Sequence, residues 1–251
     1  MEPTSVVVEL QDIVNENDKK SLWIFGYGSL CWNPGFSFEK AVAGTIHGYS
    51  RKFWQGNSTH RGTEEKPGRV VTLVKEKGSV VHGLAFQISG EAALSYLNKR
   101  ECKLGGYVVE FARFYPRARN ISFNTILYIA TAQNELWLGD APASDIADQI
   151  VESCGASGHN VEYLIRLAAF MHYHFPNEKD DHLFAIERLV IMKLRDRKAC
   201  LKALMGDERE TITFISNASL DDLQRDGLEE RQNSFQYAAN VPVKIMRCLN
   251  M

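Results

Sequence analysis

A short loop with two glycines is the first feature of this sequence that could do chemistry. Large apolar residues at 23–25 predict a buried strand, and the loop after it consists of Gly26, Tyr27, Gly28, Ser29, Leu30 and Cys31. Glycine lets other groups approach the main chain closely, and successive N–H groups in such a loop can converge on a carboxylate or an oxyanion. The loop is therefore a candidate ligand site, and a tight turn without a ligand is the alternative.

Glu101 is the second candidate, as a general acid or base. Residues 90–101 have the pattern of a helix, and Glu101 follows Leu94 by seven residues, so its carboxyl group projects from the apolar face. Partial burial and the negative end of the helix dipole would both raise its pKa, which suits proton transfer at neutral pH. A last-turn residue paired with Arg100 or Lys103 is the alternative interpretation.

Weaker candidates are an arginine, two cysteines and two histidines. Arg61 lies in a polar loop and could bind a substrate carboxylate through two hydrogen bonds, although such loops are more often simply solvated. Cys31 and Cys102 could act as nucleophiles, but no local signature ties a histidine to either. His172 and His174 are two apart in a helical pattern and point in different directions, so we predict no metal site.

Composition and motif spacing argue against several function classes. A dinucleotide fingerprint needs a third glycine where Cys31 stands, and no P-loop lysine follows the glycines. The formal net charge of −2 provides no basic field for nucleic acid. No apolar run is long enough to span a bilayer, and residues 1–20 match neither a secretory signal nor a transit peptide. Five cysteines without a Cys-x-x-Cys pair fit a reducing compartment, so we expect a cytoplasmic protein.

The order of the elements predicts an α+β fold in which the helices are concentrated toward the C-terminal part. The 251 residues, 45% of them hydrophobic, suffice for one good-sized domain with an appendage. Strand patterns come first, at residues 23–25, 41–46, 49–54, 69–74, 80–86, 107–115 and 125–131. The runs 69–74 and 80–86 predict a hairpin. Such an order favours a curled sheet or barrel with helices packed on it.

Three helices are predicted after the strands. Their expected N-caps are Ser144, Asn160 and either Asp180 or Asp181, and the first of them would extend its apolar face to Cys154. Residues 198–205 could extend the last helix, and residues 211–215 could form a short strand. We therefore expect a polar arm at 1–20, the main domain at 21–194, and a C-terminal appendage of unknown role at 195–251.

Several segments together resemble the ChaC-type gamma-glutamylcyclotransferases. They are the Phe-Gly-Tyr-Gly-Ser-Leu run at 25–30 and residues 53–56, 60–62, 67–73, 96–101, 105–107, 137–142, 157–164 and 181–183. Each motif alone is weak, but they follow in order from Trp23 to about Leu194, roughly two-thirds of the chain. The arm before Trp23 and the tail after Leu194 are not covered by the resemblance.

The resemblance implies a small mixed β-barrel surrounded by helices. It also implies a lyase that cyclises the gamma-glutamyl group of glutathione, releasing 5-oxoproline and cysteinylglycine. In such an enzyme the loop 26–31 would cradle the gamma-glutamyl group, Glu101 would be the catalytic base, and Tyr107 would help to shape the pocket. Arg61 stays a substrate-binding candidate.

No metal or cofactor is expected, because the attacking amine and the attacked carbonyl belong to one substrate molecule. Two alternatives stay open at this point. One is a cyclotransferase for other gamma-glutamyl amino acids or amines, and the other is a non-catalytic binding module of the same fold. The sequence predicts no particular protein partner.

Overall fold

A closed barrel forms one half of the structure, a computed structural model that describes residues 21–89, 107–118 and 121–206. Five strands lie in the order β1-β3-β2-β4-β5. They are β1 (Ser21–Gly26), β2 (Lys40–Asn57), β3 (Gly68–Ser89), β4 (Val108–Pro116) and β5 (Phe123–Ile129). β1 pairs in parallel with β5 through Ile24 and Ile126, and the other neighbouring strands are antiparallel. The predicted mixed barrel is confirmed.

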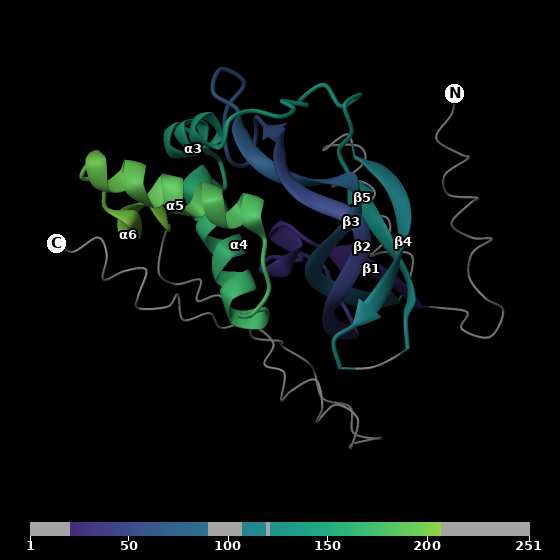
Figure 1. The fold of residues 1–251 in the computed structure, drawn as a ribbon. Coiled ribbons are helices and arrows are strands. Elements are labelled where there is room, and N and C mark those ends of the chain that lie inside the picture. The colour runs from purple at the N-terminus through teal and green to yellow at the C-terminus, as the bar shows by residue number, and fades with distance from the viewer. Residues whose placement is uncertain (1–20, 90–106, 119–120, 207–251) are drawn as a thin grey trace.

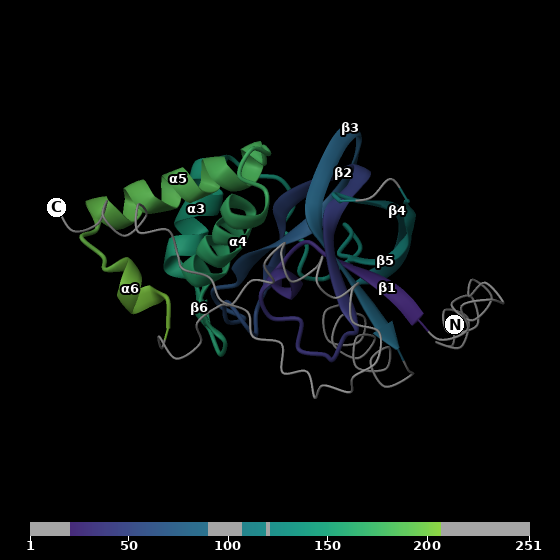
Figure 2. The same cartoon turned by 90° about the horizontal axis from the view of Figure 1, so that it is seen from below.

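Helices form the other half. They are α3 (Ala143–Glu152), α4 (Asn160–His174), α5 (Asp181–Asp196) and the short α6 (Leu201–Leu204). Two views at right angles show all of them on one side of the barrel (Figures 1 and 2). α3, α4 and α5 contact one another, α3 and α4 also contact β3, and α5 contacts β2. The α+β class, with helices toward the C-terminal part of the chain, is confirmed.

Two strands are longer than the sequence predicted. Residues 41–46 and 49–54 belong to the single strand β2, which bends at a bulge where Gly48 has a φ of 82°. The predicted hairpin of 69–74 and 80–86 is wrong, because both runs lie in β3 and pair with β2. Gly78, with a φ of 86°, is a bend within β3. Glycine permits this conformation both in tight turns and in bulges, so the local sequence could not distinguish a hairpin turn at Gly78 from a bend within one strand.

The other strand predictions are confirmed within two residues. β4 and β5 correspond to the predicted runs 107–115 and 125–131, and β1 contains the apolar residues 23–25. The predicted helix at 90–101 and the predicted strand at 211–215 lie outside the described residues.

The helix starts follow from specific hydrogen bonds. Asp180 is the N-cap of α5, since its Oδ1 accepts the N–H of Leu183 at 3.1 Å. The prediction for α4 is wrong, because the cap is His159, whose ring Nδ1 accepts the N–H of Val161 at 3.1 Å. Asn160 is instead the first helical residue and is fully buried. A buried side chain that binds main chain elsewhere in the fold cannot also cap its own helix.

Three further helix boundaries differ from the prediction. The N-cap of α3 is Pro142, and Ser144 lies in the first turn of that helix. α3 ends at Glu152, so Cys154 lies beyond it in a two-stranded hairpin of β6 (Cys154–Gly155) and β7 (Gly158–His159). After α5 the chain turns at Lys198, with a φ of 51°, and α6 is a separate helix. In the described parts of the chain, no helix combines the length and apolarity that crossing a membrane requires.

Candidate active site

The loop 26–31 leaves the barrel directly from the end of β1. Ser29–Cys31 form a turn of 3₁₀ helix, η1, in which the N–H of Cys31 donates to the carbonyl of Gly28 at 2.9 Å. The N–H groups of Trp32 and Asn33 both donate to the carbonyl of Ser29, at 3.1 and 2.8 Å. The N–H groups of Cys31, Trp32 and Asn33 are therefore already bound within the turn. A ligand bound by this loop would have to use earlier ones, such as that of Gly28.

Close packing, and not an unusual φ, explains the glycine at position 28. Its φ is −127°, which other residues adopt. A Cβ atom there would lie 2.9 Å from Oη of Tyr163 and 3.0 Å from Cγ2 of Val71. Since real Cβ atoms essentially never come closer than 3.0 Å to such atoms, a side chain would force the loop away from α4. The expected close approach to the main chain is thus present, and the neighbour is a tyrosine hydroxyl.

We expect Gly28→Ala to lower kcat/KM for glutathione, the substrate that the sequence resemblance implies, at least about 10-fold. It should also destabilise the fold by about 1–3 kcal/mol, because overpacking shifts the loop. Steady-state kinetics and urea unfolding of the same preparation would measure both. Gly139→Ala gives the cost of backbone strain without crowding, since that glycine has a positive φ of 68° and the nearest neighbour to an added Cβ is 3.4 Å away. Unchanged kinetics in Gly28→Ala would contradict the importance of this contact.

Two tyrosines fix the loop between the barrel and α4. The hydroxyl of Tyr27 donates to the carbonyl of Tyr128 at 2.6 Å, at the end of β5. Tyr163, on α4, accepts the N–H of Val71 through its hydroxyl oxygen at 3.2 Å, and its ring lies edge-on to that of Trp32. Burial raises the pKa of Tyr163, so it acts as a neutral hydrogen-bonding group. The loop is held on both sides by parts of the chain far from it in sequence.

Cys31 is unsuited to nucleophilic catalysis. Its side chain is 1% exposed and its thiol donates to the carbonyl of Gly26 at 3.3 Å. Burial raises its pKa to about 12. Because the thiolate is the nucleophile, a thiol with such a pKa is inert at neutral pH. Cys102, the other cysteine considered, lies outside the described residues.

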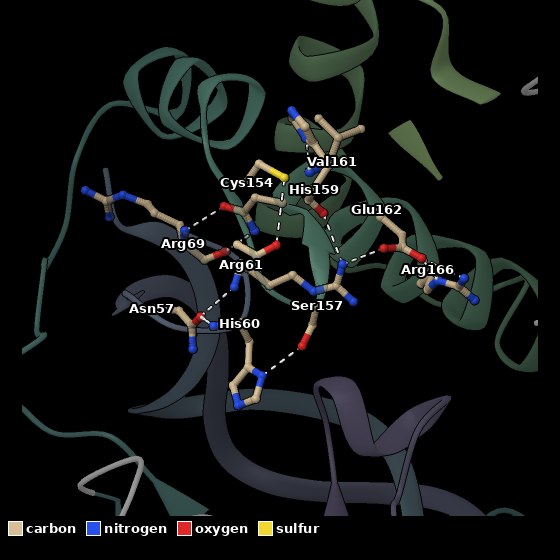
Figure 3. Close-up of polar contacts among 12 residues, drawn as sticks. Asn57, His60, Arg61, Arg69, Cys154, Ser157, His159, Val161, Glu162 and Arg166 are labelled. Carbon is tan, nitrogen blue, oxygen red and sulfur yellow. Dashed lines mark hydrogen bonds and ion pairs between the residues drawn. The ribbon is translucent and has the colours of Figure 1, made fainter. Parts of the chain in front are cut away.

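Arg61 forms a charged cluster with α4. Its Nη1 binds Oε2 of Glu162 at 2.5 Å and the carbonyl of His159 at 3.2 Å, while Oε1 of Glu162 accepts Nε and Nη2 of Arg166 at 2.8 and 2.6 Å (Figure 3). Only 12% of the Arg61 side chain is exposed. One glutamate therefore joins two arginines, and the cluster fastens the β2–β3 connection to α4. Binding of a substrate carboxylate by Arg61 stays a prediction.

Two further sets of hydrogen bonds hold the β2–β3 connection in place. Oδ1 of Asn57 accepts the N–H groups of His60 and Arg61 at 2.8 and 2.7 Å, and Nδ1 of His60 lies 2.8 Å from Oγ of Ser157 in the β6–β7 hairpin (Figure 3). Asn160 binds the main chain of Arg69 through both atoms of its amide, at 2.6 and 2.9 Å. These hydrogen bonds hold the barrel, which carries the loop 26–31, against α4. The sequence analysis did not predict this role.

The remaining predicted site residues lie at or beyond the limits of the description. Glu101 lies outside the described residues, so its role stays a prediction. Tyr107 lies immediately before β4 and is half-buried against the core. Among the described side chains, no group of three or more histidines, cysteines and carboxylates is arranged to hold a metal ion.

Comparison with known proteins identifies the family. A protein-family model described as ChaC-like protein matches residues 22–193. The chain belongs to the ChaC-like family. It is 47% identical to glutathione-specific gamma-glutamylcyclotransferase 1 of Danio rerio, over 74% of this chain and 95% of that protein. With the protein of the same name from Homo sapiens it shares 48% identity, over 68% of this chain and 79% of that protein.

A solved structure agrees with this assignment. The crystal structure of a yeast gamma-glutamyl cyclotransferase specific to glutathione superimposes with a TM-score of 0.63 at 26% sequence identity. The match covers 68% of this chain and 96% of the yeast chain. The fold is therefore the mixed barrel with packed helices that the sequence motifs predicted, and the described helices lie on one side of that barrel.

In this ChaC-like domain, buried polar contacts join the barrel to the start of α5. Nη1 of Arg51 binds Oδ2 of Asp180 at 2.7 Å, and Nε2 of His182 accepts the N–H of Phe53 at 3.0 Å. Burial, reinforced by repulsion from Lys52, lowers the pKa of His182 from 6.5 to about 4. The imidazole is therefore neutral in the folded protein at physiological pH.

His182 makes the stability depend on pH. The imidazole of His182 binds a proton more readily in the unfolded state than in the folded one. The contribution of His182 to the free energy of unfolding is therefore complete above pH 6.5 and is lost as the pH falls toward 4. We expect the unfolding free energy in urea to fall by about 1–2 kcal/mol between pH 7 and pH 5 through this group. His182→Gln, whose amide oxygen can still accept the N–H of Phe53, should show a smaller fall.

His172 acts in the opposite direction, so the comparison must keep it in both proteins. Its hydrogen bond to Glu187 raises its pKa, which makes its contribution complete below pH 6.5 and lost as the pH rises through the raised value. The difference between wild type and His182→Gln therefore isolates His182. Identical pH profiles of the two proteins would contradict the assignment.

Proposed function

We propose that this protein degrades glutathione by cyclising its gamma-glutamyl group, which releases 5-oxoproline and cysteinylglycine. The observation that carries the proposal is the 47% identity with the Danio rerio glutathione-specific enzyme across 95% of that enzyme's length. The tightly packed loop 26–31 at the end of β1 supports it, because a rigid loop can hold a substrate in one conformation. The protein is then a cofactor-independent lyase.

The reaction follows from the chemistry of the substrate. The α-amino nitrogen attacks the γ-carbonyl carbon, a new C–N bond closes a five-membered ring, and the amide bond to the cysteine nitrogen breaks. At neutral pH the amine is protonated and cannot attack. Glu101 takes this proton and later gives it to the departing cysteine nitrogen.

The loop and Tyr107 complete the proposed site. An N–H group of the loop, such as that of Gly28, binds the α-carboxylate of the substrate or the oxyanion that develops on the γ-carbonyl, and Tyr107 shapes the pocket beside it. The catalytic unit comprises residues 21–194. The protein acts in the cytoplasm, which agrees with the reducing compartment that its cysteine content indicates.

Incubation of purified protein with glutathione, followed by mass spectrometry for 5-oxoproline and cysteinylglycine, tests the proposal. Gamma-glutamylalanine and a gamma-glutamylamine serve as comparison substrates. Formation of both products from glutathione, at a higher kcat/KM than from the comparison substrates, is the expected result. Product from the comparison substrates alone would move the assignment to another gamma-glutamyl substrate, and absence of any product would overturn it.

A further inference from the structure

The turn between α4 and α5, residues 175–180, is fastened to two strands of the barrel. From β2, Nη1 of Arg51 binds Oδ2 of Asp180 at 2.7 Å, and the side chain of Arg51 is 1% exposed. From β3, Nε2 of His82 lies 3.4 Å from Oε2 of Glu178. The side chain of His82 is 12% exposed, whereas that of Glu178 is 52% exposed. The turn is therefore held through barrel side chains that water hardly reaches.

Phe175, the first residue of the turn, brings two histidines and an arginine together. Its ring is buried, and the ring centroid lies 5.0 Å from that of His82 and 6.3 Å from that of His174, the last residue of α4. The guanidinium carbon of Arg117, directly after β4, lies 6.0 Å from the same centroid. Nη1 of Arg117 also binds the carbonyl of His174. Two groups that can take up a proton thus lie beside a permanent cation.

His174 has the surroundings of an imidazole that stays neutral. The residue is 2% exposed, and its ring packs against those of Phe170 and Tyr173, at centroid distances of 4.8 and 4.9 Å. Burial lowers the pKa of His174 from 6.5 to about 4, and the positive charge of Arg117 adds to this effect. A proton on His174 would therefore bury one positive charge beside another.

Burial is also the largest influence on His82, and it lowers the pKa of that imidazole. The charges around the ring oppose one another. Glu178 and Asp180 favour a proton on the ring, and the positive charges of Arg51 and Arg117 disfavour it. The attraction of Glu178 is screened by water, because that side chain is half exposed. Asp180 is already paired with Arg51.

Protonation of both histidines would upset the charge balance of this junction. When both imidazoles are neutral, two arginines of the barrel face two carboxylates of the turn. These four residues are Arg51, Arg117, Glu178 and Asp180. When both imidazoles are protonated, four cations face the same two carboxylates. Buried charges without partners are costly, and the cost disappears when the groups return to water.

We infer that acid releases the turn 175–180 from the barrel, with His82 and His174 together as the proton-sensitive switch. The turn opens when both rings take up protons and move into water, and it closes again when the protons leave. α3 contacts both α4 and α5, which keeps these two helices together while the turn between them opens. The release is therefore local and reversible.

Amide hydrogen exchange resolved by NMR tests the inference without substrate, so the result does not depend on the proposed function. The reporter is the N–H of Glu178, which donates to the carbonyl of Phe175 at 3.0 Å within the turn. Amides in the paired strands β4 and β5 are the reference. The proteins are wild type, the double variant His82→Gln/His174→Gln, and the matched control His47→Gln, which removes an exposed histidine of β2.

From pH 7.5 to pH 5.5, the protection of the Glu178 amide should fall about 10-fold more in wild type than in the double variant. The contribution of His174 to the closed turn is complete above pH 6.5 and is lost as the pH falls toward 4, which alone accounts for this factor. His82 adds to it. His182 is present in both proteins and cancels in the comparison. His47→Gln should behave like wild type, and all rates are corrected for the pH dependence of exchange in unstructured peptides.

Three results would overturn the inference. Equal loss of protection in wild type and the double variant would mean that other groups respond to acid. Unchanged protection of the Glu178 amide in wild type would mean that the turn stays closed. An equal fall in the amides of β4 and β5 would mean that the whole domain opens. If the double variant does not fold, His174→Gln alone replaces it, with the same expected difference of about 10-fold.

Discussion

Replacing Glu101 by glutamine should reduce kcat for glutathione cyclisation by about 10²- to 10⁴-fold, the usual contribution of a general acid or base. Glutamine has the same shape but cannot take the proton from the substrate's ammonium group. The fold and most of the substrate binding should persist. Single-turnover formation of 5-oxoproline, with glutathione binding measured by calorimetry, would separate the two effects.

Glu64→Gln is the control for this experiment, because Glu64 is exposed in the β2–β3 connection. It should retain wild-type turnover. Retention of turnover in Glu101→Gln would remove Glu101 from its proposed role, while loss of binding as well as turnover would indicate that Glu101 holds the substrate and does not transfer its proton.

Asp180→Ala should lower the free energy of unfolding by about 3–5 kcal/mol, the range found when one member of a buried ion pair is removed. The side chain of Arg51 is 1% exposed, and Nη1 of that residue relies on Asp180 for its ion pair. The same carboxylate caps α5 through the N–H of Leu183, so the substitution also removes a helix cap. Urea unfolding at pH 7 would measure the loss.

The neighbouring residue provides the matched control. Asp181 is also acidic and lies in the first turn of α5, but it is exposed. Asp181→Ala should cost no more than about 1 kcal/mol, through the helix dipole alone. Similar losses in both variants would show that the pair with Arg51 contributes nothing beyond the local charge effect.

Local signals were sufficient for the class of the fold and for most strands. Alternating or continuous apolar runs located β4 and β5 within two residues. The signals failed at Gly48 and Gly78, where glycines that could end a strand instead bend β2 and β3 at a register shift, and the two strands pair on both sides of it. Whether a glycine ends or bends a strand depends on the partner strand, which no local pattern contains.

The contacts that build the site are long-range, and for this reason they could not be predicted. Arg61 was considered as a substrate ligand because it lies in a polar loop and could form two hydrogen bonds with a carboxylate, yet Glu162, 101 residues away, binds it at 2.5 Å. Asn160 looked like a helix cap but binds the main chain of Arg69, 91 residues away. The loop 26–31 itself was evident from its glycines, whereas its packing against Tyr163 required the fold.

The wide sequence separation between the loop 26–31 and its supports has a consequence during protein synthesis. Tyr27 binds the main chain of Tyr128, 101 residues later, and α4, which carries Tyr163, follows later still. At 5–20 residues per second, the ribosome takes roughly 5–20 s to add about 100 residues. Until then the loop lacks the two tyrosine contacts that fix it to the end of β5 and to α4, and only its neighbours on β3 are present. We therefore expect that a nascent chain that ends before α4 does not cleave glutathione, and that activity begins only after the complete domain has been synthesised.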